Sequence, residues 1–369
     1  MYKKQNHNKK PLNQDIRIRF SKDNLRNSII LIGVISLLAS IKNQTNRWRL
    51  LSVEPNETGM SITQIYSKEP NTQNCSEGIL NDSEKQKVLN RLNYIRQLHS
   101  LSPVNYSYKD DVYSAKSALI TAANAEKNER PNPIFRCWDE QYSAVGNSLS
   151  YAISYPPGNT QISPTMNLYK SENFVDALLM DSRRKNSAGS RRLLNPFLKS
   201  ISFGRVDGES LARQATIIGY DGKPVERQAD YITGATIKFI SDDSQNPDDL
   251  NINVNSIAYP NGEYPHQLFK KDVYQYGYPP MLFSVIKNEQ KLVGLHDVDF
   301  SNSSIEISDQ AGQIVEVNSI QYQANDRALP NMITWKVSQI QPNIKYTVKI
   351  KHVKVFDTIN DYEYWFKLR

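Results

Sequence analysis

The stretch NSAGSRRLLNP, residues 186–196, holds residue types that could carry chemistry. Ser190 is a candidate nucleophile, and the adjacent Arg191 and Arg192 could clamp an anion such as a phosphate, a lipid head group or a glycan. A serine nucleophile needs a base within hydrogen-bond reach. The stretch also lacks the second glycine of the G-x-S-x-G elbow that exposes such a serine. We therefore asked which bases the rest of the chain supplies.

Histidine is the usual partner of a serine nucleophile, and the chain has only five. His99 follows a predicted helix, where we expect a partly exposed role at the helix C-terminus. His7 lies in the basic N-terminal segment, and His266, His296 and His352 lie in a β-rich C-terminal region. Because no histidine is clearly placed to act as a base for Ser190, we predict no catalytic residue and keep a serine hydrolase as the alternative.

The two arginines also have a structural interpretation. An arginine after a glycine-containing turn often ties backbone carbonyls or an internal acid, and Asp181 lies nearby in the sequence. We favour this role for Arg191 and Arg192 and keep anion contact as the alternative. A second candidate contact surface is the aromatic run YQYGYPP, Tyr274 to Pro280, because such clusters can bind glycans or peptides. Tyr and Pro clusters also lie at the edges of β-sandwiches, which is the interpretation that we favour.

The distribution of charge argues against a nucleic-acid-binding protein. The formal charge of the 369-residue chain is +7. Eight basic and two acidic residues precede residue 28, so the N-terminal segment carries +6 and the rest of the chain only +1. A nearly neutral body lacks the basic surface that duplex binding requires. We expect no nucleic-acid partner.

The N-terminal segment predicts export. The uncharged run SIILIGVISLLASI, Ser28 to Ile41, follows the basic residues and is shorter than the roughly 20 apolar residues of a spanning helix. A cationic region before a short apolar run is typical of an export signal, with Leu38-Ala39-Ser40 as a candidate cleavage site. The protein would then be periplasmic, cell-surface or secreted. An uncleaved signal would anchor it in the inner membrane, as its only membrane contact.

The cysteine count agrees with export. An even number in an oxidising compartment suggests one disulfide between Cys75 and Cys137, with two unrelated buried thiols as the alternative. Neither cysteine has a histidine or a second cysteine at metal-ligand spacing. We expect no metal and no cofactor.

Hydrophobic periodicity predicts helices first and strands later. After a polar spacer, residues 42–74, a capping box of Ser83 and Gln86 begins a helix to about Ser100. Further helices are expected over about residues 111–127 and 171–181, and strands over 200–206 and 215–220.

From Tyr259 onward, short alternating runs separated by turn residues predict an immunoglobulin-like β-sandwich with Trp335 in its core. The expected strands are residues 281–286, 303–308, 314–320, 332–337, 346–353 and 362–368.

Several motifs in order resemble bacterial CAP-domain proteins, relatives of cysteine-rich secretory and pathogenesis-related proteins. LNYIRQLHSLSPV, Leu92 to Val104, is similar to the family's first helix and turn, with Asn93 and Arg96 at its Asn-x-x-Arg positions. Gly189, Arg191 and Arg192 follow its Gly-His-Arg-Arg segment, and the two cysteines fall where some members carry a pair. The resemblance implies an α+β protein with an α-β-α sandwich over residues 75–250. An immunoglobulin-like sandwich over residues 251–369 and an export segment over residues 1–41 complete it.

The resemblance also implies a degenerate cleft. Family members with an intact cleft hold a divalent metal with two histidines and acidic residues; here Glu129 and Ser190 stand at the histidine positions. Asn147 stands where the family has an acid, and Asp181 remains as the cleft acid. Too few nitrogen donors are left for a zinc-type site. We expect an exported, non-enzymatic protein that binds or scaffolds cell-envelope polymer, lipid or protein. The alternative is a hydrolase or metal-dependent enzyme that uses Glu129 and Asp181.

Overall fold

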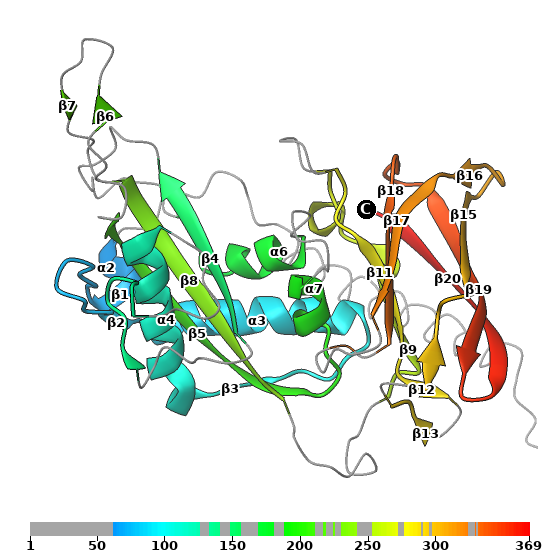
Figure 1. Ribbon diagram of the computed structural model, residues 1–369, viewed down its shortest axis with the longest axis horizontal. Coiled ribbons are helices and arrows are strands. Elements are labelled where there is room, and N and C mark those ends of the chain that lie inside the picture. Colours follow the sequence, from blue (N-terminus) through cyan, green and yellow to red (C-terminus); the bar gives the residue numbers. More distant parts are fainter. Residues whose placement is uncertain are drawn as a thin grey trace, which may run out of the picture. The chain divides into compact units, whose positions relative to one another are not determined.

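The structure is a computed structural model. It describes residues 62–125, 133–140, 148–155, 169–180, 188–210, 217–218, 224–225, 230–241, 253–271, 277–288, 291–294, 297–323, 329 and 331–369. The chain divides into two compact units, Met1–Thr58 and Gly59–Arg369, and every described residue belongs to the second. Helices accompany the first large sheet of this unit, and its C-terminal part consists mainly of strands (Figure 1). The predicted α+β class is confirmed, whereas the domain boundary near residue 250 stays a prediction.

The three predicted helices are present with shifted ends. They are α3 (Asp82–Leu98), α4 (Asp111–Asn124) and α6 (Asn173–Leu179), and two short helices, α2 (Ile62–Ile65) and α7 (Ala188–Leu193), accompany them. The predicted capping box is wrong, because α3 begins at Asp82 and Ser83 therefore lies inside its first turn. Asn81 precedes the helix and makes no side-chain cap. Asp82 and Glu84 instead place negative charge at the positive end of the helix dipole.

Four strands form the first large sheet, in the order β3-β5-β8-β4. They are β3 (Asn105–Tyr106), β5 (Leu198–Ser210), β8 (Asp230–Ser241) and β4 (Ser148–Tyr155). β5 contains the predicted strand 200–206, but β4 and β8 were not predicted. Of the predicted strand 215–220, the structure describes only Ile217–Ile218 (β6), which pairs with Pro224–Val225 (β7).

Helices cover both faces of this sheet (Figure 1). Side chains alternate along a strand, so neighbouring residues of β5 face different layers. Phe203 packs against Phe174 of α6 with ring centroids 6.3 Å apart. The Ser202 hydroxyl lies 2.6 Å from the Ser114 hydroxyl of α4. α4 therefore lies on one face, and α6 lies on the other.

Glycine lets α4 approach the sheet closely. A Cβ atom added to Gly204 of β5 would lie 2.1 Å from the carbonyl oxygen of Ser114. One added to Gly234 of β8 would lie 2.4 Å from the carbonyl oxygen of Ala118. These contacts are with backbone, which no side-chain rotation can relieve. The α4 backbone thus rests directly on the two central strands.

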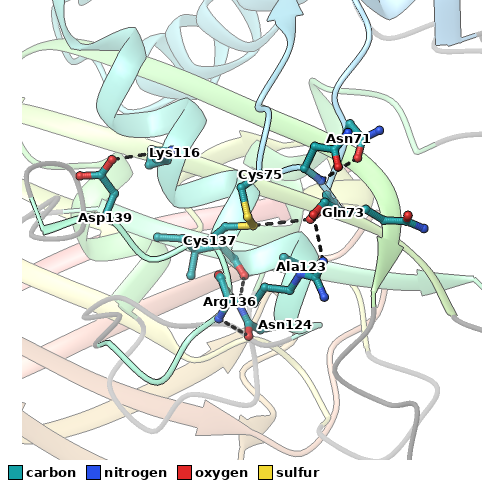
Figure 2. Close-up of a disulfide and its surroundings, with 12 residues drawn as sticks. Asn71, Gln73, Cys75, Lys116, Ala123, Asn124, Arg136, Cys137 and Asp139 are labelled. Carbon is teal, nitrogen blue, oxygen red and sulfur yellow. Dashed lines mark hydrogen bonds and ion pairs between the residues drawn. A yellow bond between two sulfur atoms is a disulfide. The ribbon is translucent and has the colours of Figure 1, made fainter.

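A disulfide-linked hairpin precedes α3, so ordered structure begins earlier than predicted. β1 (Tyr66–Lys68) pairs with β2 (Ile79–Leu80), and the turn between them carries Cys75. Cys75 is bonded to Cys137, 62 residues away, which confirms the predicted disulfide (Figure 2). Arg136 extends this link, because its Nη2 donates to the Gln73 carbonyl oxygen at 3.0 Å. The hairpin is thereby fixed to the segment that follows α4.

The C-terminal part contains two larger sheets. The four-stranded one has the order β17-β18-β11-β9, with β17 (Val317–Gln323), β18 (Met332–Val337), β11 (Met281–Val285) and β9 (Ser256–Tyr259). The six-stranded one has the order β10-β20-β19-β15-β16, with β10 (Gly262–Tyr264), β20 (Thr358–Leu368), β19 (Lys345–Val355), β15 (Ser304–Asp309), β16 (Ile314–Val315) and β14 (Val298–Asp299) beside β19. A small hairpin of β12 (Lys287–Asn288) and β13 (Lys291–Leu292) lies beyond β11.

Each predicted C-terminal strand corresponds to one or two of these strands, since β16 and β17 divide the run 314–320. The two sheets meet through Phe283 of β11, which stacks on Tyr364 of β20 with an angle of 9° between the rings. Trp335 is 1% exposed, so its predicted place in the core is confirmed. One hydrophobic cluster contains buried residues of α3, α6 and both sheets.

Among the described residues, no helix is long and apolar enough to cross a membrane. The apolar run at residues 28–41, on which the predicted signal or anchor rests, lies outside the described residues.

The contact of α4 with the sheet predicts the effect of a single methyl group. We expect Gly204→Ala to lower the free energy of unfolding by about 2 kcal/mol or more, because its Cβ would collide with backbone. Gly312→Asn is the control, since Gly312 has open space around it and a positive φ that Asn tolerates. Urea unfolding measures both variants. Equal stability of the two would contradict the close contact.

Candidate functional site

The stretch around Ser190 forms the helix α7, not the turn that the family resemblance led us to expect. Position 189 of this helix requires glycine, because a Cβ atom there would lie 1.7 Å from the carbonyl oxygen of Leu178 in α6. The need for glycine is therefore set by a neighbouring helix and not by a turn conformation. α6 and α7 pack together through this contact.

Ser190 lies inside this packed helix. It is 2% exposed, and its carbonyl oxygen accepts a hydrogen bond from the Leu194 amide at 2.9 Å. A catalytic serine must present its hydroxyl to substrate beside a base. His99, the one histidine predicted near this region, uses both of its ring nitrogens in other contacts. The geometry of Ser190 therefore favours a packing role.

The arginine pair binds groups of the protein itself. Arg191 Nη1 donates to the Gln323 side-chain oxygen of β17 at 2.7 Å, so it joins α7 to the edge of the four-stranded C-terminal sheet. Arg192 Nη1 donates to the carbonyl oxygen of Ser148, at the start of β4. Both contacts fit the structural interpretation of the pair. Anion contact remains an alternative that these contacts do not require.

The Asn-x-x-Arg residues of α3 hold the backbone that follows them. Asn93 Nδ2 donates to the Val104 carbonyl oxygen at 3.0 Å, and its Oδ1 accepts from the Val104 amide at 2.8 Å. Arg96, which is 0% exposed, donates to the carbonyl oxygens of Ser102, Leu193 and Asn195 at 2.8 to 3.0 Å. Burial lowers the pKa of Arg96 to about 10, so its guanidinium stays charged at neutral pH. This one side chain ties α3 to α7.

Three of the predicted cleft positions, Glu129, Asn147 and Asp181, lie outside the described residues. Of that set the structure therefore places Ser190 alone. The contact of Arg192 with Ser148 brings the helix that contains Ser190 to the start of β4.

His99 is buried, which corrects the expected partly exposed position. It is 3% exposed at the end of α3. Its Nδ1 lies 2.8 Å from the carbonyl oxygen of Ala258 and must carry the hydrogen, because a carbonyl only accepts. Its Nε2 then accepts from the Tyr264 hydroxyl at 3.2 Å. Burial lowers the pKa of His99 to about 4, and the charge of Arg96 adds to this effect. The imidazole is thus a neutral link between α3 and residues of the β-rich part.

A buried ion pair on β5 was missed by sequence reasoning. Arg205 Nε lies 2.7 Å from Asp207 Oδ2, and both side chains are 0% exposed. The Tyr66 hydroxyl donates to the same oxygen at 2.5 Å, and the Thr233 hydroxyl donates to Oδ1. Burial raises the pKa of Tyr66 well above its ordinary value, and the charge of Asp207 adds to it.

The ion pair could have been found in the sequence GRVDG, because residues two apart in a strand share a face. It extends to α3, since Arg205 Nη1 donates to the Ser171 hydroxyl at 3.0 Å, which donates to buried Glu84 at 2.7 Å. Every charge here has a partner and is shielded from solvent. A general acid or base must reach a substrate, so this network is suited to holding the sheet and helices together.

One further predicted feature, the aromatic run, lies partly within the described residues. Of the aromatic run at residues 274–280, the structure describes residues 277–280, where the Tyr278 hydroxyl donates to the Ile340 carbonyl oxygen at 2.8 Å. Tyr278 therefore makes a structural contact within the β-rich part, and the rest of the run lies outside the described residues.

Within the described part of the chain, no group of three or more His, Cys, Asp or Glu side chains is placed to hold a metal ion.

Comparison with known proteins yields no assignment: no family model matches the chain, and no curated protein matches it.

The buried His99 predicts acid-sensitive stability. Well above pH 6.5 the imidazole is neutral in both the folded and the unfolded protein, so the contribution of His99 to the free energy of unfolding is fully present. As the pH falls toward 4, the unfolded chain takes up a proton that the folded protein resists, and the free energy of unfolding falls by up to about 3 kcal/mol. Urea unfolding at several pH values measures this loss. The dependence of the free energy of unfolding on pH should become weaker in His99→Gln. It should persist in the control His352→Gln, which changes an exposed histidine. An unchanged slope in His99→Gln would refute the assignment.

Proposed function

We propose that the protein is an exported, non-enzymatic binding or scaffolding protein of the cell envelope. Its first part would be a CAP-like α-β-α domain with a degenerate cleft, and its second an immunoglobulin-like β-sandwich. Envelope polymer, lipid or protein would be its partner. The disulfide between Cys75 and Cys137 supports export, because such bonds persist in oxidising compartments.

The observation that carries the proposal is that the residues of α7 are buried or bound to other parts of the protein. Ser190 stands where the resemblance implies a metal-binding histidine, and it is 2% exposed in a packed helix. The neighbouring arginines hold Gln323 and Ser148. These contacts connect α7 to β17 and β4, so its serine and arginine side chains are engaged within the protein and not directed to a substrate.

Layered architecture supports the CAP-like part. Helices on both faces of a mainly antiparallel sheet fit the α-β-α arrangement that the resemblance implies. Asn93 and Arg96 make backbone contacts of the kind expected for residues that define a fold. Two facing sheets after residue 253 support the sandwich.

The competing function is a hydrolase or metal-dependent enzyme with a remodelled cleft. Glu129 and Asp181 would then replace histidines as ligands or act as an acid and base pair. Carboxylates alone suit calcium or magnesium better than zinc, so both kinds of ion enter the test.

Metal analysis of the purified protein separates the two functions. We expect sub-stoichiometric zinc and calcium, and no change in melting temperature when either ion is added. A ligand present at 100 times its Kd would stabilise the fold by about 2.7 kcal/mol and raise that temperature. A stoichiometric metal that disappears in Asp181→Ala, but stays in the exposed-turn control Asp357→Ala, would overturn the proposal.

A further inference from the structure

The four-stranded sheet of the β-rich part ends in an edge strand, β17. β17 is the last strand of the four-stranded sheet, and among the described residues it pairs only with β18. Such an edge presents unpaired backbone groups that can bind a further strand. Proteins usually guard these edges with charges or proline, but β17 has the sequence VNSIQYQ, which contains neither.

The bulge in β17 leaves part of this edge regular. The register shifts between Asn318 and Gln321, where Ser319 has a φ of 54°. Beyond the bulge, Gln321, Tyr322 and Gln323 pair in order with Thr334, Ile333 and Met332. Two large apolar side chains stand out on this strand: Ile320 is 47% exposed and Tyr322 is 58% exposed. Exposed apolar groups beside an unguarded strand edge favour contact with an apolar partner.

A groove of about 410 Å³ opens where β17 begins. Its lining contains Asp309, Ile314, Glu316, Ile344 and Tyr346. Strands of the six-stranded sheet contribute to it, together with the residue before β17 and the residues that follow β18. Ile314 is 67% exposed, so one large apolar side chain stands at a groove whose lining is otherwise mainly polar. An incoming chain could therefore touch β17 and the groove together.

The groove has a distinct charge. Its lining includes two carboxylates, Asp309 and Glu316, and no basic residue. In the described part of the chain neither carboxylate has an ion pair, whereas Glu306 and Glu363 of the same sandwich are paired with lysines. The turn holds Asp309 in place, because its Oδ1 accepts the Ala311 and Gln313 amides at 2.8 and 2.9 Å. A fixed carboxylate beside a second one favours a cationic partner.

We infer that this edge binds an extended segment of a partner polypeptide with alternating apolar and basic residues. The segment would add to β17 as a strand, cover Ile320 and Tyr322, and place a basic side chain against Asp309 and Glu316. Strand addition gains affinity from main-chain hydrogen bonds and specificity from alternate side chains. The inference rests on the proposed binding role and names its partner class.

Fluorescence anisotropy with two labelled peptides tests the inference on the full chain with its disulfide intact. KVKVKVK is the matching probe, and EVEVEVE has the same alternation with opposite charge. We expect binding of the first and not of the second. Tyr322→Lys should weaken binding about tenfold, and Glu316→Lys about fivefold or more. Ile359→Lys and Asp357→Lys change exposed residues at and beside the β19–β20 turn and should leave binding unchanged.

Each other outcome rejects strand addition. Equal binding of the two peptides would show adhesion without recognition of charge. Loss of binding in Glu316→Lys with full binding in Tyr322→Lys would reduce the site to a cation pocket. Hydrogen exchange adds an independent measurement, because a bound strand should slow exchange of those amides of residues 321–323 that face away from β18. Failure of these tests leaves the metal analysis untouched, so it can be told apart from failure of the proposed function.

Discussion

The first half of the described structure depends on one buried guanidinium. Arg96 donates to carbonyl oxygens of Ser102, Leu193 and Asn195, which belong to two segments about 90 residues apart. Its Nη2 is buried with no hydrogen-bond partner among the described groups. A buried charge is costly unless its partners are fixed, so this side chain constrains the turn after α3 and the end of α7 at once.

The remaining contacts follow from that constraint. With the end of α7 held against α3, Gly189 packs on α6, and the arginine pair reaches β4 and β17. His99 adds a second link from α3 to Ala258 and Tyr264 of the β-rich part. Residues that first suggest a nucleophile, an anion clamp and a base therefore share one physical role: they pack against neighbouring elements or form hydrogen bonds with them.

Local sequence patterns predicted the long helices and most strands of the C-terminal sheets. β19 alternates buried and more exposed residues, whereas β11 is a short apolar run in which every residue is buried. β8 is also buried on both faces, but threonine and glycine interrupt the apolar residues of its sequence DYITGATIKFIS, so it was missed. The candidate site depends on distant partners: Gly189 needs Leu178, and His99 needs residues some 160 positions away. Ser190, Arg191 and Arg192 could be selected as candidates from the sequence alone, and so could the disulfide. The helical conformation and the burial of Ser190 could not, because they depend on packing against other elements.

Hydrogen exchange of the Arg96→Lys variant tests the central claim most directly. A lysine ammonium is compact and cannot reproduce the fork of donors that reaches three carbonyls. If Arg96 holds both segments, amides at residues 101–104 and 188–195 should lose protection together, while those of β19 and β20 keep theirs. Unchanged protection at residues 188–195 would contradict the account, because α7 would then be held in place without Arg96.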